Sequence, residues 1–414
     1  MSLLTTNLSL VRRSDFWRVS IRVVLSIAVL TTLALSLLFG TDRNHYFGYL
    51  ASAFAHRSFS VNDLPAYYAD RVLQNGNIYL PLAPLPAILL LPFASVLGLI
   101  DEVWLAYFFT AANVLAALVL LKRLRIPNAR QRELLALFFC GTIYFSALVM
   151  GRSWFLAHII ATTFLLFALL EGLSRRRAGV IGAWLGLAFL TRAPAIFALP
   201  FFLWILKPAR VAWLDLRFWF QQGFLLALGA LVPMLFFFDY NYVRFGSLLE
   251  TGYANAIVGS TVLTEALRFG LFSPVHLAKN LYALFLAMPQ AYPSFSAPVL
   301  QFPYIYPSPW GMGIFFTTPA FVYVFAANRS EKLVRAAWLG IGLVLIPLVT
   351  YYGVGWMQFG YRYALDFYPF LFVLVALGMN SHFDWRARAL ICLSIVINIW
   401  GAWWQMTGFF GLQN

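Results

Sequence analysis

The feature that most constrains this chain is a series of apolar stretches, each about 20 residues long or somewhat shorter, that recurs along its whole length. A helix needs about 20 apolar residues to cross the hydrocarbon core of a bilayer. The sequence is 62% hydrophobic and only 11% charged, whereas soluble domains carry about 25% charged residues. We therefore expect an all-α polytopic membrane protein without an independent soluble domain.

Eleven apolar segments are candidate crossings, and the fifth and sixth are short enough to be two halves of a bent hairpin around residues 191–194. They lie near residues 20–40, 102–121, 133–150, 155–173, 178–191, 193–206, 218–238, 311–327, 333–352, 364–379 and 388–408. Residues 1–414 then form a single transmembrane domain with two extracytoplasmic segments, 41–101 and 239–310. Both segments read as mixtures of short amphipathic helices and loops.

The basic residues orient the chain. Twenty of the 29 lysines and arginines fall in segments on one side of the predicted membrane. Cytoplasmic loops collect such residues, so the N-terminus is expected in the cytoplasm and the C-terminus outside. This bias also accounts for the formal net charge of +14 without a nucleic-acid partner. These residues are Arg12, Arg13, Arg18, Arg22, Lys122, Arg123, Arg125, Arg130, Arg132, Arg175, Arg176, Arg177, Lys207, Arg210, Arg217, Arg329, Lys332, Arg335, Arg386 and Arg388.

One apolar segment, residues 79–97, is not counted as a crossing. It contains four prolines, and counting it would invert the charge pattern of the later loops. We expect it to lie in, or dip into, the outer membrane face, where protein or a watered cavity covers its backbone. Residues 280–288 are a second candidate interfacial helix.

The nine remaining basic residues are expected on the outer side, against the general trend. Several lie next to apolar helix ends, where an unpaired charge costs roughly 2.5–3.5 kcal/mol or more. Each one alone is explained by snorkelling to headgroups or by pairing with a nearby acid. As a set they favour a site for an anion such as a lipid-linked phosphate, because the arginine fork matches phosphate oxygens. They are Arg43, Arg57, Arg71, Arg152, Arg192, Arg244, Arg268, Lys279 and Arg362.

Asp42 is the candidate general base, because it closes the first predicted helix and opens the first external segment. A carboxylate there is suited to accept a proton from an acceptor hydroxyl or amine. The neighbouring Arg43 offers the alternative of a local ion pair. The other acids of this region read as solvated loop residues or as partners of a helix dipole: Asp63, Asp70, Asp101 and Glu102.

Two further stretches contain candidate substrate-binding residues. In GRSWFLAH, His158 shares a helical face with Trp154, and either positions a substrate or is a hydrogen-bonded core residue. In GWMQFGYRYALDFYPF, Arg362 and Tyr363 suit a phospho-sugar. Arg362 and Asp366 are four residues apart, so a local salt bridge is the alternative.

Several function classes find no support in the sequence. The cytoplasmic loops are short, and neither GxxxxGK[ST] nor GxGxxG occurs, which argues against transport driven by ATP bound to this chain. The two cysteines, Cys140 and Cys392, both lie in apolar runs and form no CxxC motif. A structural metal or a disulfide framework is therefore not expected.

Taken together, these motifs resemble the GT-C superfamily of membrane glycosyltransferases. The closer resemblance is to the branch that contains protein O-mannosyltransferases and lipid A aminoarabinose transferases. It covers most of the chain and rests on TDRNHYFGYLASAFAHRSF, YLPLAPLPAILLLPFASVLG, VLLKRLR, GLAFLTRAP and YRYALDFYP. The branch often has a second acid after the third helix, where this chain has Arg152 and His158 instead.

The resemblance implies transfer of a sugar from a polyprenyl-phosphate donor to a lipid, glycan or protein acceptor at the extracytoplasmic face. Asp42 would be the base, and Arg192 and Arg362 would hold the donor phosphate, with Arg152 or Arg244 as further candidates. No cofactor and no divalent metal is expected, and the partners are membrane lipids. Absence of an organelle signal favours a bacterial inner membrane. The alternatives are a lipid-linked sugar flippase or transporter without chemistry, a polymer ligase and an inactive scaffold.

Overall fold

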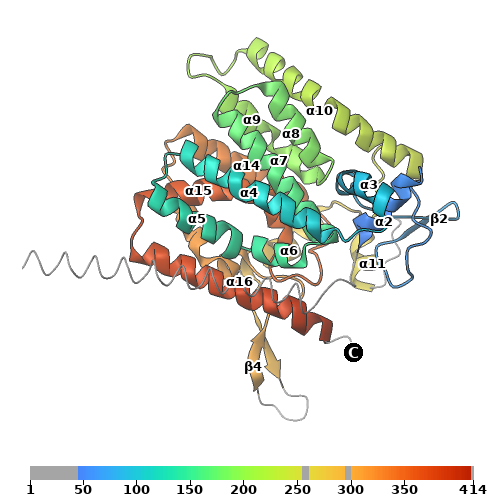
Figure 1. Ribbon diagram of the computed structural model, residues 1–414. Helices are drawn as coiled ribbons and strands as arrows, with labels where there is room; N and C mark the ends of the chain where they lie inside the picture. The colour runs from blue at the N-terminus through green and yellow to red at the C-terminus, as the bar shows by residue number, and fades with distance from the viewer. Residues whose placement is uncertain (1–44, 254–260, 294–299, 412–414) are drawn as a thin grey trace, which may run out of the picture.

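A computed structural model describes residues 45–253, 261–293 and 300–411. The first predicted crossing, residues 20–40, and the candidate base Asp42 lie outside these ranges. Helices dominate the described chain, and two short hairpins extend from the helical body (Figure 1). This agrees with the expected helical membrane protein.

Five helices of the described residues are long and apolar enough to cross a membrane. A sixth candidate is the pair α5 (Asn128–Cys140) and α6 (Tyr144–Met150), which is bent by 55°. All six fall where the sequence predicts a crossing, which identifies an integral membrane protein. The five are α4 (Val103–Arg123), α7 (Ser153–Leu173), α10 (Leu216–Phe245), α14 (Lys332–Thr350) and α16 (Trp385–Gly411).

Four other predicted crossings are shorter or interrupted in the structure. A proline lies at one of the first two positions of each long 3₁₀ segment and of the helix Tyr368–Ser381. Proline disfavours α geometry in the residue before it. Several of these segments change helix type midway, and the count of eleven crossings stays a prediction. They consist of α8 (Ala178–Phe189); η1 (Ala193–Ala198) with α9 (Leu199–Leu206); α13 (Ile314–Thr317) with η5 (Pro319–Ala326); and η6 (Arg362–Asp366) with α15 (Tyr368–Ser381).

Helix α7 is the core of the described structure. In its most apolar window 83% of the residues are buried, compared with 39% in α4 and 22% in α10. A helix that is apolar on every side is stable only when other helices surround it. Accordingly α4, α6 and α8 pack against α7, which also contacts the first segment that the sequence predicts to be external.

Helices α8 and α10 pack in very close contact through glycines. A Cβ atom added at Gly182 would lie 2.0 Å from the carbonyl oxygen of Leu226. One added at Gly229 would lie 1.9 Å from the carbonyl oxygen of Gly179. Small residues allow such backbone approach between membrane helices. The contact fixes α8, which ends just before Arg192.

The first segment predicted to be external contains α2 (Tyr46–Ala55), a hairpin of β1 (Val72–Gln74) and β2 (Asn77–Tyr79), and α3 (Leu85–Leu97). The sequence predicted only short helices and loops in this segment, and the hairpin corrects that prediction. Asn75 and Gly76 form its two-residue turn, both with positive φ, which is the usual signature of a tight hairpin. The proline-rich stretch is the short helix α3, packed on α2 rather than crossing as a long span.

The second segment predicted to be external begins later than expected, because α10 continues to Phe245. It too contains a hairpin, and the predicted interfacial helix is an α-helical turn followed by a π-helical turn. Its elements are α11 (Thr261–Leu267), η3 (Pro274–His276), α12 (Leu277–Leu281), η4 (Tyr282–Leu286), β3 (Gln290–Pro293) and β4 (Leu300–Tyr306).

Candidate functional site

Three segments that are distant in sequence meet at one place. The first turns of α7 carry His158, the end of α8 leads into Arg192, and the turn η6 carries Asp366. The Asp366 carboxylate accepts a hydrogen bond from Nδ1 of His158 at 2.9 Å. It also accepts two from Arg192, from Nε at 3.2 Å and from Nη2 at 2.8 Å. His158 and Asp366 are fully buried, so this ionic cluster has little access to water.

The local ion pair between Arg362 and Asp366 does not form. The segment is a 3₁₀ helix, in which residues three apart lie on one face and residues four apart do not. Asp366 therefore faces the interior and pairs with Arg192.

Arg362 is consequently a buried cation without a carboxylate within salt-bridge distance among the described residues. It is 8% exposed. Its Nη1 donates to the backbone oxygen of Trp356 at 3.1 Å, whereas its Nε has no acceptor in the part of the chain described. The guanidinium lies 5.5 Å from the Trp154 ring, 5.3 Å from Phe155 and 5.4 Å from Tyr363. Aromatic faces stabilise the charge in part but leave donors free for an anion.

Tyr363 lies between the two arginines. Its ring centroid is 5.4 Å from the guanidinium of Arg192 and 5.4 Å from that of Arg362. Further tyrosines continue the aromatic surface: Tyr351 is 5.9 Å from Tyr363 and 6.3 Å from Tyr253. Such a surface suits the apolar face of a sugar.

Asp70 approaches the same cluster from the loop that precedes β1. Its Oδ2 accepts a hydrogen bond from Nε1 of Trp154 at 2.7 Å, and its backbone N–H donates to the Tyr46 hydroxyl at 3.1 Å. Burial raises the pKa of the Asp70 carboxyl, and the Trp154 N–H and the charge of Arg362 oppose this shift. The interpretation of Asp70 as a solvated loop residue was wrong, because its carboxylate is hydrogen-bonded to Trp154 in the first turn of α7.

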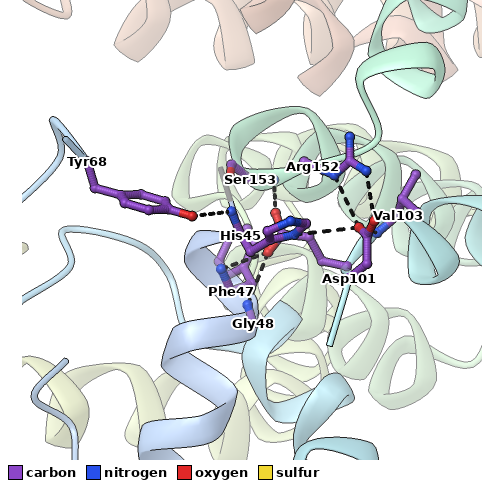
Figure 2. Close-up of polar contacts among 9 residues, drawn as sticks. His45, Phe47, Gly48, Tyr68, Asp101, Val103, Arg152 and Ser153 are labelled. Atoms are coloured by element: carbon purple, nitrogen blue, oxygen red, sulfur yellow. Dashed lines mark hydrogen bonds and ion pairs between the residues drawn. The ribbon is translucent and has the colours of Figure 1, made fainter. Parts of the chain in front are cut away.

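A second carboxylate fixes the helices that carry these groups. Glu102 is fully buried and accepts hydrogen bonds from the backbone N–H groups of Phe47 at 2.8 Å, Gly48 at 3.1 Å and Ser153 (Figure 2). These groups are the free donors at the N-termini of α2 and α7, where a negative charge is favourable. Glu102 thus caps two other helices rather than its own. It holds Tyr46 and Trp154 in contact, with ring centroids 5.3 Å apart.

Arg152 has a structural contact beside this junction. Its Nε and Nη2 bind both oxygens of Asp101 at 3.1 and 2.7 Å, and His45 lies on the other side of the same carboxylate at 3.6 Å (Figure 2). Arg152 is therefore turned toward the loop that precedes α4. Its role in substrate binding stays a prediction.

Arg244 also has structural partners. Its guanidinium donates to the backbone oxygens of Leu80 and Tyr240 and to the side-chain oxygen of Asn241, at 2.6, 3.0 and 2.9 Å. It lies against the rings of Tyr240 and Phe245. Arg244 thus joins α10 to the end of the β1–β2 hairpin. Unlike Arg362, it has few hydrogen-bond donors left.

The site therefore contains four of the predicted residues, His158, Arg192, Arg362 and Tyr363. It also contains Asp70 and Asp366, whose roles the sequence did not indicate. No group of three or more histidine, cysteine or acidic side chains with metal-binding geometry occurs in residues 45–253, 261–293 and 300–411. Comparison with protein-family models, with curated proteins and with solved structures found no match.

Proposed function

We propose that this chain is a membrane glycosyltransferase of the GT-C type. It moves a sugar from a polyprenyl-phosphate donor to an acceptor at the extracytoplasmic face of the membrane. The observation that carries the proposal is Arg362, a buried guanidinium with free donor capacity and no carboxylate in salt-bridge range among the described residues. An anionic ligand would supply the missing charge, and a phosphate fits the arginine fork.

The phosphate would bind between Arg362 and the edge of Arg192 that Asp366 leaves free. Both cations would stabilise the negative charge that develops on the departing lipid phosphate. Tyr363, which contacts both guanidinium groups, and the neighbouring tyrosines would contact the sugar. No nucleotide is needed, because a polyprenyl phosphate is itself the leaving group.

The proposed step is a single displacement with inversion at the anomeric carbon. The acceptor oxygen or nitrogen forms a bond to this carbon while the bond to the phosphate oxygen breaks, and its electron pair stays on the lipid phosphate. The acceptor proton passes to a carboxylate. Asp42 is the carboxylate expected from the sequence, and Asp70 is the second candidate, because burial raises its pKa and Arg362 is near it.

A transfer assay with the purified protein tests the proposal. It would use a panel of radiolabelled polyprenyl-phosphate sugars, membrane extract as acceptor, and the variants Asp42→Asn and Asp70→Asn. We expect the wild type to transfer label and the variant lacking the base to lose at least about 100-fold in rate, the lower range for general-base catalysis. Donor binding should persist in that variant.

The control is Asp63→Asn, which changes an exposed acid of the same external segment. It should retain the wild-type rate. Donor binding without transfer by the wild type, with every sugar and with acceptor present, would contradict the enzyme and favour a flippase or transporter of the same lipid.

A further inference from the structure

A separate cavity lies at the other end of the transmembrane body. Its volume is about 340 Å³, and it opens between the end of α4 and the start of α5. Helix α4 has 21 residues and is therefore about 30 Å long, so this cavity is a membrane thickness away from Asp101 and Glu102. Six residues line it: Leu118, Lys122, Asn128, Gln131, Arg132 and Leu135.

The polar end of this cavity offers several hydrogen-bond donors and two cations. Lys122 and Arg132 are exposed, and neither forms an ion pair with any described residue. The buried Gln131 donates to the backbone oxygen of Ile126 at 2.7 Å and to Oδ1 of Asn128 at 3.1 Å. That contact uses the acceptor of the Asn128 amide and leaves its NH₂ group free to donate. Two cations and an amide donor thus surround one end.

No acid of either helix neutralises these cations. Helix α4 contains no acidic residue, and the one acid of α5, Glu133, accepts a hydrogen bond from Nε of Arg388 at 2.9 Å. The other end of the cavity is apolar. Leu118 lies one turn before Lys122 on α4, and Leu135 lies about one turn after Arg132 on α5, both toward the middle of the membrane.

We propose that this cavity binds the headgroup of an anionic phospholipid. The phosphate would contact Lys122, Arg132 and the Asn128 amide, and the first part of an acyl chain would pack on Leu118 and Leu135. Basic pockets between membrane helices on the cytoplasmic side bind such lipids. The positive-inside distribution assigns this end to the cytoplasm, so the site differs in place and ligand from the proposed transfer site.

Lipid binding to the delipidated full-length protein, counted by native mass spectrometry, tests this site. The probes are phosphatidylglycerol and phosphatidylcholine with identical acyl chains. We expect one phosphatidylglycerol to bind at least tenfold more tightly than phosphatidylcholine. The double variant Lys122→Gln/Arg132→Gln should lose this preference, since each cation near the headgroup contributes substantially. The matched control Arg123→Gln/Arg175→Gln removes the same charge from exposed residues outside the cavity and should keep it.

A second variant controls for the possibility that the double variant misfolds. Asn128→Asp adds a negative charge beside the phosphate, yet it suits the first turn of α5, where acids favour the helix dipole. It should fold normally and bind phosphatidylglycerol more weakly. Equal binding of the two lipids, or equal losses in the cavity variant and its control, would overturn the proposal. So would displacement of the lipid by an equal concentration of inorganic phosphate, which would assign the cavity to a free anion.

Discussion

Asp366 and Arg192 are 174 residues apart and form a bidentate ion pair, with Nη2 2.8 Å from one carboxylate oxygen and Nε 3.2 Å from the other. Because this pair forms, Asp366 is not available to Arg362, four residues before it. Arg192, which is partly buried, is therefore neutralised by protein, whereas the buried Arg362 has free donors. This difference assigns distinct expected roles to two residues that the sequence treated alike.

Replacement of Arg362 should weaken binding of the proposed donor phosphate. Charge-assisted hydrogen bonds are worth about 1.5–3 kcal/mol, so Arg362→Gln should reduce donor affinity about 10- to 100-fold. Arg362→Lys should recover part of this loss, because it restores the charge but not the fork. Binding of a labelled polyprenyl phosphate measures the effect. The control Arg268→Gln changes an exposed arginine and should bind the donor normally. An equal loss of affinity in this control would mean that the net charge of the protein, rather than Arg362, governs binding.

Asp366→Asn should destabilise the protein, because it leaves the partly buried Arg192 charge without its partner. Breaking a buried ion pair typically costs about 3–5 kcal/mol. Thermal unfolding in detergent measures the change. The double variant Asp366→Asn/Arg192→Gln removes both charges and should be more stable than Asp366→Asn alone. If it is less stable by the sum of the single effects, the two side chains do not act as a pair.

Glu102 should make stability depend on pH. Burial raises the pKa of this carboxyl from 4.5 to about 7, although three backbone N–H groups lower it. Since the folded pKa exceeds the unfolded one, this contribution is fully present below about pH 4.5 and is lost as pH rises through about 7. The free energy of unfolding should fall by about 3 kcal/mol over that window.

Glu102→Gln should flatten this dependence, because glutamine does not titrate and retains an acceptor oxygen. Unfolding midpoints at pH 5 and pH 8 give the comparison. The control Asp63→Asn removes an exposed acid and should preserve the slope of the wild type. A slope unchanged by Glu102→Gln would assign the pH dependence to other groups.

Gly229→Ala should separate α10 from α8, because its Cβ would overlap a backbone carbonyl at 1.9 Å. Overpacking of this kind costs about 1–3 kcal/mol. Gly223→Ala is the matched control on the same helix, since nothing lies within 4 Å of its Cβ position. It should be neutral or slightly stabilising. Equal unfolding midpoints for the two variants would show that the close approach is not required.

The sequence by itself determined the membrane class and the positions of the six strongest spans, because the length and hydropathy of a segment are local properties. The hairpin at Asn75 and Gly76 was also readable from local turn chemistry, although it was not predicted. The sequence also indicated four residues of the site, His158, Arg192, Arg362 and Tyr363, because polar and charged side chains are unusual in apolar surroundings.

Only the tertiary structure decided how these residues pair. The contacts of Asp366 with His158 and Arg192 span 208 and 174 residues, and the contact of Asp70 with Trp154 spans 84. Spacing within one helix cannot encode these contacts. They depend on the close packing of α8 on α10, on where the N-terminal end of α7 lies, and on the 3₁₀ geometry of η6. The physical reason is that burial and charge compensation are properties of the assembled helices.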